Sequence, residues 1–480
     1  MSSEGAAALP RYQQLAEELA ALMASGALRP GDRLPSVRQT QRARRCSAAT
    51  VFQAYYLLES RGLIRAAPRS GYFVAPPPSQ APTRSTPRPE PGPVEVSELV
   101  FQLLGSSGPA IHAPFGSAFP SAALFPLEKL RRALVAGSRK MSAEQLTADL
   151  PAGHEELRRQ IALRYLRLGL AITPDEIVLT HGALEALNLS LQLLTRPGDA
   201  VLVESPGFYA ALQAIERLGL RAIEIPTDAR EGADLQALAI LLERQQPRAC
   251  WLMSSWQNPL GSLMPADKKR ALLALLARHG VPLIEDDVYA ELHFGAQPAP
   301  PVKAFEARTT GAAVLHCGSF SKCLAPGYRV GWVAAGRLAP ALQRLKLSNS
   351  LGGSWPAQAA LAEYLQAGGF DLHLRGLRRA LQRQRDAMLD GIARHFPAGT
   401  RMTRPEGGYF VWLELPPGGD SLALHGQALA EGISLAPGPM FSARREFGRC
   451  LRLNYGHRWT PALQAALARL GSLAAAQCKA

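Results

Sequence analysis

Residues 314–332 read VLHCGSFSKCLAPGYRVGW, and this stretch decides the fold of most of the chain. Residues 314–317 are a short apolar run that is typical of a buried strand. Lys322 follows the end of that run, with hydroxyl side chains before it and Arg329 seven residues after it. A desolvated lysine near positive charge is a nucleophile for an aldehyde, while hydroxyls and an arginine can bind a phosphate dianion. The stretch therefore predicts a site for an aldehyde that carries a phosphate.

Similar apolar runs recur on both sides of this stretch and alternate with helical segments such as 182–195, 208–218 and 265–279. The alternation predicts a doubly wound, mostly parallel sheet, whose ligands bind at the carboxyl ends of the strands. The expected strands are residues 177–180, 200–204, 221–225, 249–253, 281–284, 314–317 and 331–334.

Three further motifs follow expected strands. Gly182 opens a helix whose first backbone amides suit a phosphate. Asn258, in an Asn-Pro turn, can hydrogen-bond a ring hydroxyl. Asp286 lies in a run of three acids, where one carboxylate can hold a protonated ring nitrogen while Tyr289 donates to a ring oxygen. Three acids could also bind a metal, but no ligand set of recognised spacing accompanies them, and we expect none.

The first 74 residues form a separate basic module. They contain ten arginines, no lysine and five acidic residues, which gives a net charge of +5. Leucines spaced by four and three residues predict a first helix, and Ser36 and Ser47 fit the N-caps of a second and a third. Two short strands at 63–66 and 72–74 would close a hairpin. Three helices and a hairpin indicate a winged helix-turn-helix, whose third helix enters the major groove of DNA.

Prolines divide this module from the rest of the chain. Eight of the eighteen residues from 76 to 93 are proline, a composition typical of a semi-rigid spacer. We therefore expect a head at residues 1–75, a spacer at 76–97 and a body at 98–480. The body holds +9 of the total net charge of +14. No apolar run reaches the ~18–20 residues of a membrane span, no secretory start is present, and the six cysteines form no C-x-x-C pair. We expect a cytoplasmic protein.

The head resembles the DNA-binding domain of GntR-type bacterial regulators. The matching segments are residues 28–38, 47–51, 54–55, 58–59, 62–63 and 70–74. The resemblance implies that DNA is contacted by Arg38, Ser47, Ala49, Thr50 and Arg69. Ala48 stands where the family usually has an arginine or another polar reader of bases, and Thr40 stands where it usually has a leucine. The second helix is therefore expected to be less apolar than in the family.

The body resembles the class I/II aminotransferases of fold type I, which use pyridoxal 5'-phosphate (PLP), from about residue 115 to 470. The resemblance implies that Lys322 is the catalytic residue and bonds to the cofactor, that Ser117 in the arm 116–120 lies at the substrate, and that Arg452 clamps the substrate carboxylate. The residues implied at the cofactor are Gly182, Ala183, Leu184, Phe208, Asn258, Asp286, Tyr289, Ser319, Lys322 and Arg329.

The chain departs from the aminotransferase pattern in three places. Ala183 and Leu184 lack the hydroxyl or amide side chains often found on the phosphate loop, so backbone amides would bind there alone. Residues 149–153 lack the tyrosine that often reaches the phosphate of the partner subunit. Phe208 replaces a tyrosine or tryptophan, which keeps stacking on the ring but removes a hydrogen bond.

A GntR-like head joined to an aminotransferase-like body resembles the MocR-type regulators. This implies an α/β fold class with an N-terminal winged helix-turn-helix, a large doubly wound domain and a smaller α+β C-terminal lobe. It implies a transcription regulator that binds operator DNA through its head and whose body senses PLP, an amino acid or an amine. The protein is expected to form a head-to-tail homodimer and to have no membrane partner. The alternative is a working aminotransferase, with at least a half-reaction, that carries a DNA-binding head.

Overall fold

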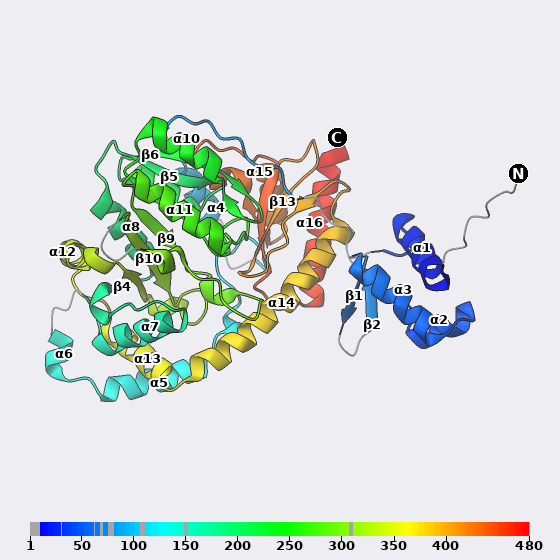
Figure 1. Cartoon of the computed structure of the whole chain (residues 1–480), viewed down its shortest axis with the longest axis horizontal. Coiled ribbons are helices and arrows are strands. Elements are labelled where there is room, and N and C mark those ends of the chain that lie inside the picture. Colours follow the sequence, from blue (N-terminus) through cyan, green and yellow to red (C-terminus); the bar gives the residue numbers. More distant parts are fainter. Residues whose placement is uncertain are drawn as a thin grey trace, which may run out of the picture.

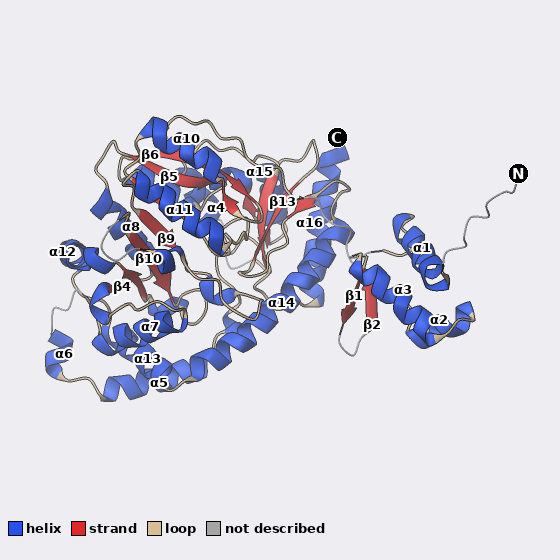
Figure 2. Ribbon diagram, viewed as in Figure 1, coloured by secondary structure: helices blue, strands red, loops and turns tan. Residues whose placement is uncertain are grey.

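The computed structural model describes residues 10–29, 31–61, 63–67, 71–74, 81–105, 111–147, 152–306 and 311–479. A small N-terminal head lies beside a much larger body (Figure 1). Helices cover both faces of the large sheet of the body, and a smaller mixed lobe contains the C-terminal part of the chain (Figure 2).

The head consists of three helices and a two-stranded antiparallel sheet. Ser36 caps the second helix in a capping box with Gln39, and Ser47 caps the third by accepting a hydrogen bond from the backbone N–H of Thr50, both as the sequence predicts. The bounds are α1 Arg11–Ala24, α2 Val37–Arg44, α3 Ala48–Ser60, β1 Ile64–Ala67 and β2 Gly71–Val74. Arg69, which falls between β1 and β2 in the sequence, lies outside the described residues.

Thr40 is buried in the head although it is polar. Its hydroxyl lies 2.8 Å from the hydroxyl of Tyr55, which donates to the backbone oxygen of Pro35 at 2.7 Å. Tyr55 therefore accepts the hydrogen bond from Thr40, and both buried hydroxyls are paired. The hydrogen bond between Thr40 and Tyr55 therefore joins α2 to α3 at a position where the family usually has a leucine.

The large sheet has the strand order β4-β11-β10-β9-β8-β5-β6-β7. Strands β11 and β7 are antiparallel to their neighbours, and the other six are parallel to one another, which confirms the mostly parallel arrangement. The bounds are β4 Ile177–Thr180, β5 Ala200–Ser205, β6 Arg221–Asp228, β7 Gly232–Ala233, β8 Ala249–Leu252, β9 Leu283–Asp286, β10 Val314–Ser319 and β11 Gly331–Ala334.

Alternate residues of each strand face different helix layers. In β5, Val201 and Val203 join the cluster with α8 and α9, whereas Ala200 and Leu202 join the cluster with α10 and α11. Both faces of the strand are therefore buried, as expected of a doubly wound sheet. The helices of this part are α4 Ser97–Gly105, α5 Leu127–Arg139, α6 Ala143–Thr147, α7 Glu155–Arg167, α8 Ala183–Leu194, α9 Tyr209–Arg217, α10 Leu235–Gln245, α11 Ala266–Arg278, α12 Ala339–Ser350 and α13 Trp355–Gln366.

The smaller lobe packs a four-stranded antiparallel sheet, in the order β12-β13-β16-β15, against helices. Its long helix α14 also packs against α13. A short parallel pair, β3 with β14, joins the segment before the arm to this lobe. The bounds are α14 Gly369–His395, α15 Ser421–Ala430, α16 Pro461–Lys479, β3 Ala113–Pro114, β12 Arg401–Met402, β13 Phe410–Glu414, β14 Ile433–Ser434, β15 Ala436–Pro437 and β16 Cys450–Asn454.

Residues 81–96, which the composition assigns to the proline-rich spacer, run along the body, and we call them the strap. Thr83 donates its backbone N–H to Glu414 of β13 at 2.7 Å, and Arg401 of β12 donates to the hydroxyl of Thr83. The hydroxyl of Ser85 donates to the backbone oxygen of Ser205 at the end of β5. The strap therefore contacts both the smaller lobe and the large sheet.

In the described part of the chain, no helix is both long enough and apolar enough to cross a membrane. The same residues contain no group of three or more His, Cys, Asp or Glu side chains that could hold a metal ion.

Candidate functional site

The residues that the sequence singles out in the body come from both lobes. Asp286 is the last residue of β9, Asn258 follows β8, Gly182 follows β4 and Lys322 follows β10, so four strands of the large sheet contribute. Arg452 comes from β16 of the smaller lobe. The site thus forms at the carboxyl edge of the large sheet, where a doubly wound fold binds its ligand.

The amine of Lys322 lies in an apolar and cationic environment. Its Nζ donates to the backbone oxygen of Ala118 at 2.9 Å and lies 4.0 Å from the ring centroid of Phe119. Burial lowers the pKa of Lys322 to about 7, and the charges of Arg452 and Arg329 contribute to this shift, while the carboxylate of Asp286 opposes it. The lysine is therefore available as a neutral nucleophile near neutral pH.

Only one of the three consecutive acids at the end of β9 has both carboxylate oxygens without a hydrogen-bond partner. Glu285 accepts from the hydroxyl of Ser254 at 2.6 Å and from two backbone amides, and Asp287 binds the imidazole of His316 at 3.0 Å. Both oxygens of Asp286 are buried without a hydrogen-bond partner. Burial, with the neighbouring charge of Asp287, raises the pKa of Asp286 to about 7.

A buried carboxylate with two unpartnered oxygens is rare and calls for a donor. A protonated ring nitrogen supplies such a donor, and the second unpartnered group nearby, the side-chain amide nitrogen of Asn258, suits a ring oxygen. The metal reading of these acids finds no support among the described residues. The free groups therefore fit a protonated pyridine ring with an oxygen substituent.

Arg452 is 1% exposed and connects the site to the arm. One of its terminal nitrogens donates to the side-chain oxygen of Asn258 at 3.0 Å, and the other donates to the backbone oxygens of Gly116 and Ser117 at 2.8 and 3.3 Å. Its Nε has no partner. The guanidinium thus keeps a donor for an incoming carboxylate.

Ser117 contributes hydrogen bonds to the site through its backbone as well as its side chain. Its backbone oxygen accepts from Arg452 and from the side-chain amide of Asn454, which lies at 2.9 Å. Its hydroxyl donates to the backbone oxygen of Phe119 at 3.0 Å, and this bond shapes the arm that bears on Lys322. Asn454, two residues after Arg452, was not among the predicted site residues, and no local pattern marks it.

An anion cradle lies beside the lysine. Gly182 has a φ of +83°, and a side chain there would lie 2.5 Å from the guanidinium of Arg329. Arg329 donates to the hydroxyl of Ser321 at 3.2 Å and to the backbone oxygen of His181 at 3.3 Å. The first amides of α8, from Ala183 on, lack intrahelical acceptors and add donors.

Ser321, which was not among the predicted site residues, is the hydroxyl that faces Arg329. Ser319 donates instead to the backbone oxygen of Val330 at 3.2 Å and to Ser321 at 3.1 Å. The Ser-x-Ser-Lys string predicts hydroxyls as phosphate donors before the lysine, and the resemblance carried over Ser319 alone. Leu184 is 45% exposed, so only its backbone faces this cradle.

Two aromatic residues flank the lysine region from different lobes. Tyr289 is buried, with its ring 5.8 Å from Nζ of Lys322, and burial raises its pKa. Tyr409, which sequence reasoning missed, packs edge-on against Tyr289 and donates to the same backbone oxygen of Ala118 as the lysine, at 3.1 Å. Phe208 precedes α9, is half-buried and packs on Tyr209.

The residues expected to contact DNA occupy the start of two helices of the head. Arg38 and Ala49 are exposed, near the N-termini of α2 and α3. The hydroxyls of Ser47 and Thr50 bond each other at 2.8 Å and cap α3. Ser47 and Thr50 thus hold the end of the helix, while Arg38 and Ala49 are open to a partner.

Two family models match the chain. The model of bacterial regulatory proteins of the gntR family matches residues 11–74. The model of aminotransferase class I and II matches residues 121–470. The first match covers the described head and the second covers most of the body.

Similar proteins share both parts or the body alone. The uncharacterized HTH-type transcriptional regulator YdcR of Escherichia coli K12 is 47% identical over 468 residues, which are 97% of this chain and 99% of its own. The probable rhizopine catabolism regulatory protein MocR of Rhizobium meliloti is 26% identical over 89% of this chain and 86% of its own. The crystal structure of LysN, the α-aminoadipate aminotransferase of Thermus thermophilus, complexed with N-(5'-phosphopyridoxyl)-L-leucine, matches with a TM-score of 0.72 and 32% identity, over 79% of this chain and 95% of its own.

Proposed function

The chain belongs to the MocR-type group of GntR transcription regulators, in which a winged helix-turn-helix precedes an aminotransferase-like body, and we propose that the body binds PLP and an amino acid and thereby controls DNA binding. The regulator function follows from the family. The ligands and the roles of individual residues are the proposal.

The unpartnered groups of the site support PLP as the cofactor. Asp286 would accept from the ring N–H, Asn258 and Tyr289 would donate to the ring oxygen, and Phe208 would stack on the ring. Lys322 would attack the aldehyde carbon, for which its lowered pKa prepares it. When bound, PLP supplies an electron sink for the bonds at the α-carbon of an amino acid.

The anion cradle supports binding of the phosphate. Arg329 would bind it as a charged fork, and Ser319, Ser321 and the backbone amides of Ala183 and Leu184 would complete the set of donors, while Gly182 leaves room for the guanidinium. Because Ala183 and Leu184 bring no polar side chain, the helix end binds through backbone alone.

Arg452 supports an amino acid as the effector. Its Nε is buried without a partner, while its terminal nitrogens already bind Asn258 and the arm. An amino-acid carboxylate on Arg452 would therefore affect both Asn258, the partner of the cofactor ring, and residues 116–120. This provides a physical link from the effector to the arm.

The head supports operator DNA as the macromolecular partner. Its net charge of +5 within 74 residues favours a polyanion, and Arg38, Ser47, Ala49 and Thr50, with Arg69 on the wing, would meet the duplex. A head-to-tail homodimer would present two heads to two half-sites. A protein that acts on the chromosome in this way works in the cytoplasm.

The buried, unpartnered carboxylate of Asp286 beside Lys322, in a chain that carries a DNA-binding head, is the observation that carries this proposal. The test is fluorescence anisotropy of the DNA upstream of its own gene with the full chain, at fixed salt, without PLP, with PLP, and with PLP plus each of the common amino acids. A change in DNA affinity with PLP, or with PLP and one amino acid, is expected. Identical affinity in every mixture would overturn the sensing role.

Transamination is a second candidate function, favoured by the joint presence of Lys322, Asp286 and Arg452. Lys322 near its pKa can accept a proton from the α-carbon of a bound amino acid and return it elsewhere. Steady turnover of an amino acid with a keto acid, alongside DNA affinity that no ligand changes, would favour this function over sensing.

A further inference from the structure

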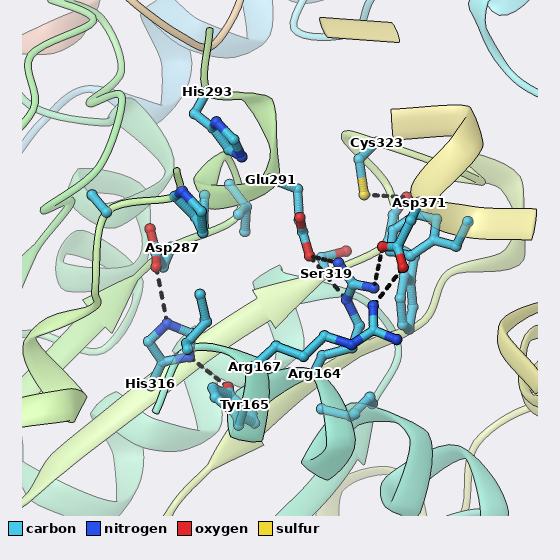
Figure 3. Close-up of a pocket in the computed structure, with 18 of the residues that line it drawn as sticks. Arg164, Tyr165, Arg167, Asp287, Glu291, His293, His316, Ser319, Cys323 and Asp371 are labelled. Carbon is cyan, nitrogen blue, oxygen red and sulfur yellow. Dashed lines mark hydrogen bonds and ion pairs between the residues drawn. The ribbon is translucent and has the colours of Figure 1, made fainter. Parts of the chain in front are cut away.

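A further cavity lies at the end of β10, and Figure 3 shows the residues that line it. Its volume is about 280 Å³, and its walls come from α7, the segment after β9, the end of β10 and α14. Ser319, which is assigned to the cofactor site, also lines this cavity, whereas Lys322, Asp286, Asn258, Arg329 and Arg452 do not. The cavity therefore borders the site described above at Ser319 and is otherwise lined by different residues.

Asp286 and Asp287 face different sides of the sheet. In the register of β9 with β10, Asp286 pairs with Cys317 and Glu285 pairs with His316, and successive side chains of a strand alternate between faces. Asp287 binds His316 with 3.0 Å between Oδ2 and Nε2, so it lies on the face of His316. One acid serves the cofactor site, and the next lines the second cavity.

A chain of hydrogen bonds ends on one oxygen of Asp287. The indole N–H of Trp332 donates to the hydroxyl oxygen of Tyr165 at 2.8 Å, and Tyr165 lies 2.7 Å from Nδ1 of His316. With Tyr165 donating to Nδ1, the Nε2–H of His316 donates to Asp287, and every donor in the chain is used. The side chain of Asp287 is 2% exposed, yet its Oδ1 has no partner.

The unpartnered oxygen belongs to an ionised carboxyl. Burial alone would raise the pKa of Asp287, but the hydrogen bond from His316, together with the charge of Lys269, lowers it. In Figure 3 this oxygen points away from the imidazole, toward the loop that carries His293. A buried anionic oxygen without a donor is costly, so the cavity is suited to a cation or another strong donor.

The other charges around the cavity are already matched. Arg164 binds Glu291 and Asp371 at 3.0 Å each, and Arg378 binds Glu291 at 3.1 Å. Among the described residues that line the cavity, Oδ1 of Asp287 is the one buried side-chain oxygen or nitrogen without a partner. A ligand that carries a negative charge would have to displace an existing ion pair.

We propose that this cavity is a second ligand site, which binds a small molecule with one protonated amine on a compact apolar body. The amine would donate to Oδ1 of Asp287, and the apolar part would pack among Ile161, Leu168, Phe320 and Phe370. A metal ion is a poorer occupant, because the described residues offer no cluster of three ligands.

An amine bound in this cavity would change the pKa of Asp286 in the cofactor site through its positive charge. The negative charge of Asp287 raises the pKa of Asp286, so an ammonium on Asp287 would lower it and favour the ionised form that holds the ring nitrogen. This consequence rests on the proposed function, whereas binding in the cavity does not.

The test is isothermal titration calorimetry of the full chain in saturating PLP with N,N-dimethyl-2-phenylethylamine. A tertiary amine cannot form an imine with the aldehyde of PLP, so heat from the cofactor site is avoided. Saturable binding of one amine per chain is expected, with 2-phenylethanol, which lacks the charge, at least about tenfold weaker. No saturable binding up to about 10 mM would leave water as the occupant and overturn the proposal.

Four variants test where the amine binds. Asp287→Asn should lower the affinity for the amine at least about tenfold. Ala296→Trp, on the exposed rim, should block the cavity without touching the core. Asp371→Asn removes an equal charge from the same wall but one that is paired with arginines, and should change the affinity less than about threefold. Ala296→Ser should bind normally. Unchanged binding in both Asp287→Asn and Ala296→Trp, or equal losses in Asp371→Asn and Asp287→Asn, would refute the site.

Discussion

The affinity for PLP is expected to fall steeply below pH 7, because the site must lose two protons before it can hold the cofactor. Asp286 must be ionised to accept from the ring N–H, and burial raises its pKa to about 7, so its proton stays on until near neutrality. Lys322 must be neutral to attack the aldehyde, and burial lowers its pKa to about 7, so its proton leaves only near neutrality. Both required forms prevail above pH 7 and are lost together below it.

The size of the effect follows from these two values. At pH 5.5, about 1.5 units below each pKa, each group is in its required form about 3% of the time. The affinity should therefore fall about 1,000-fold between pH 8 and pH 5.5. Asp286→Asn removes one of the two protonations, so its affinity should fall only about 30-fold over the same range. At pH 8 the variant should already bind about 30-fold more weakly, since loss of a buried charge partner costs about 2 kcal/mol or more.

Equilibrium dialysis is the appropriate assay, because it counts bound PLP whatever its colour. Lys322→Ala should show a reduced pH dependence like that of Asp286→Asn. Asp371→Asn, whose carboxylate is paired with arginines on α7, serves as the control and should follow the natural chain. A pH curve of Asp286→Asn parallel to that of the natural chain would mean that another group governs the loss, and would refute the reasoning.

Three other changes test the remaining roles. Arg452→Lys should weaken binding of the amino acid about tenfold in a spectral titration but leave binding of PLP within about threefold, because lysine has no counterpart of the unpartnered Nε–H; equal losses would point to a structural role. Arg38→Ala should weaken operator binding and reduce the slope of log affinity against log salt by about one, as anisotropy measures it, and an unchanged slope would place Arg38 away from phosphate. Ser36→Ala should destabilise α2 by about 1 kcal/mol, seen as about fivefold faster hydrogen exchange of its first amides, whereas unaltered exchange would contradict the cap.

Features that depend on neighbours in sequence were predictable. The caps at Ser36 and Ser47 and the buried face of α3 are set within one or two helical turns, and they appear as expected. Seven of the eight strands of the large sheet were placed within two residues at their starts, because a buried parallel strand is an apolar run between turns, whereas the two-residue β7 was not predicted. The ends of β5, β6, β9 and β10 extend beyond the expected runs into polar residues, as at Glu285 and Asp286 of β9.

Features that depend on contacts between distant segments could not be predicted from the sequence. Arg452 and Asn258 are hydrogen-bonded across 194 residues, and Tyr409 and Ala118 across 291, and nothing local marks either pair. Spacing alone left the choice among three adjacent acids open and only the resemblance selected Asp286, whereas in the structure the hydrogen bonds of Glu285 and Asp287 leave Asp286 without a partner. Proline content indicated a spacer but could not show that residues 81–96 pack on the body.

The strap and the head are both attached to the smaller lobe. Thr83 of the strap is bonded to Glu414 and Arg401 of that lobe, and only from Arg84 and Ser85 onward does the strap bond to the large sheet and its helices. In the head, Arg65 of β1 pairs with Asp390 of α14, so the head contacts the same lobe directly. A ligand that turned one lobe against the other would therefore carry the head with the smaller lobe and change the spacing of paired heads on DNA.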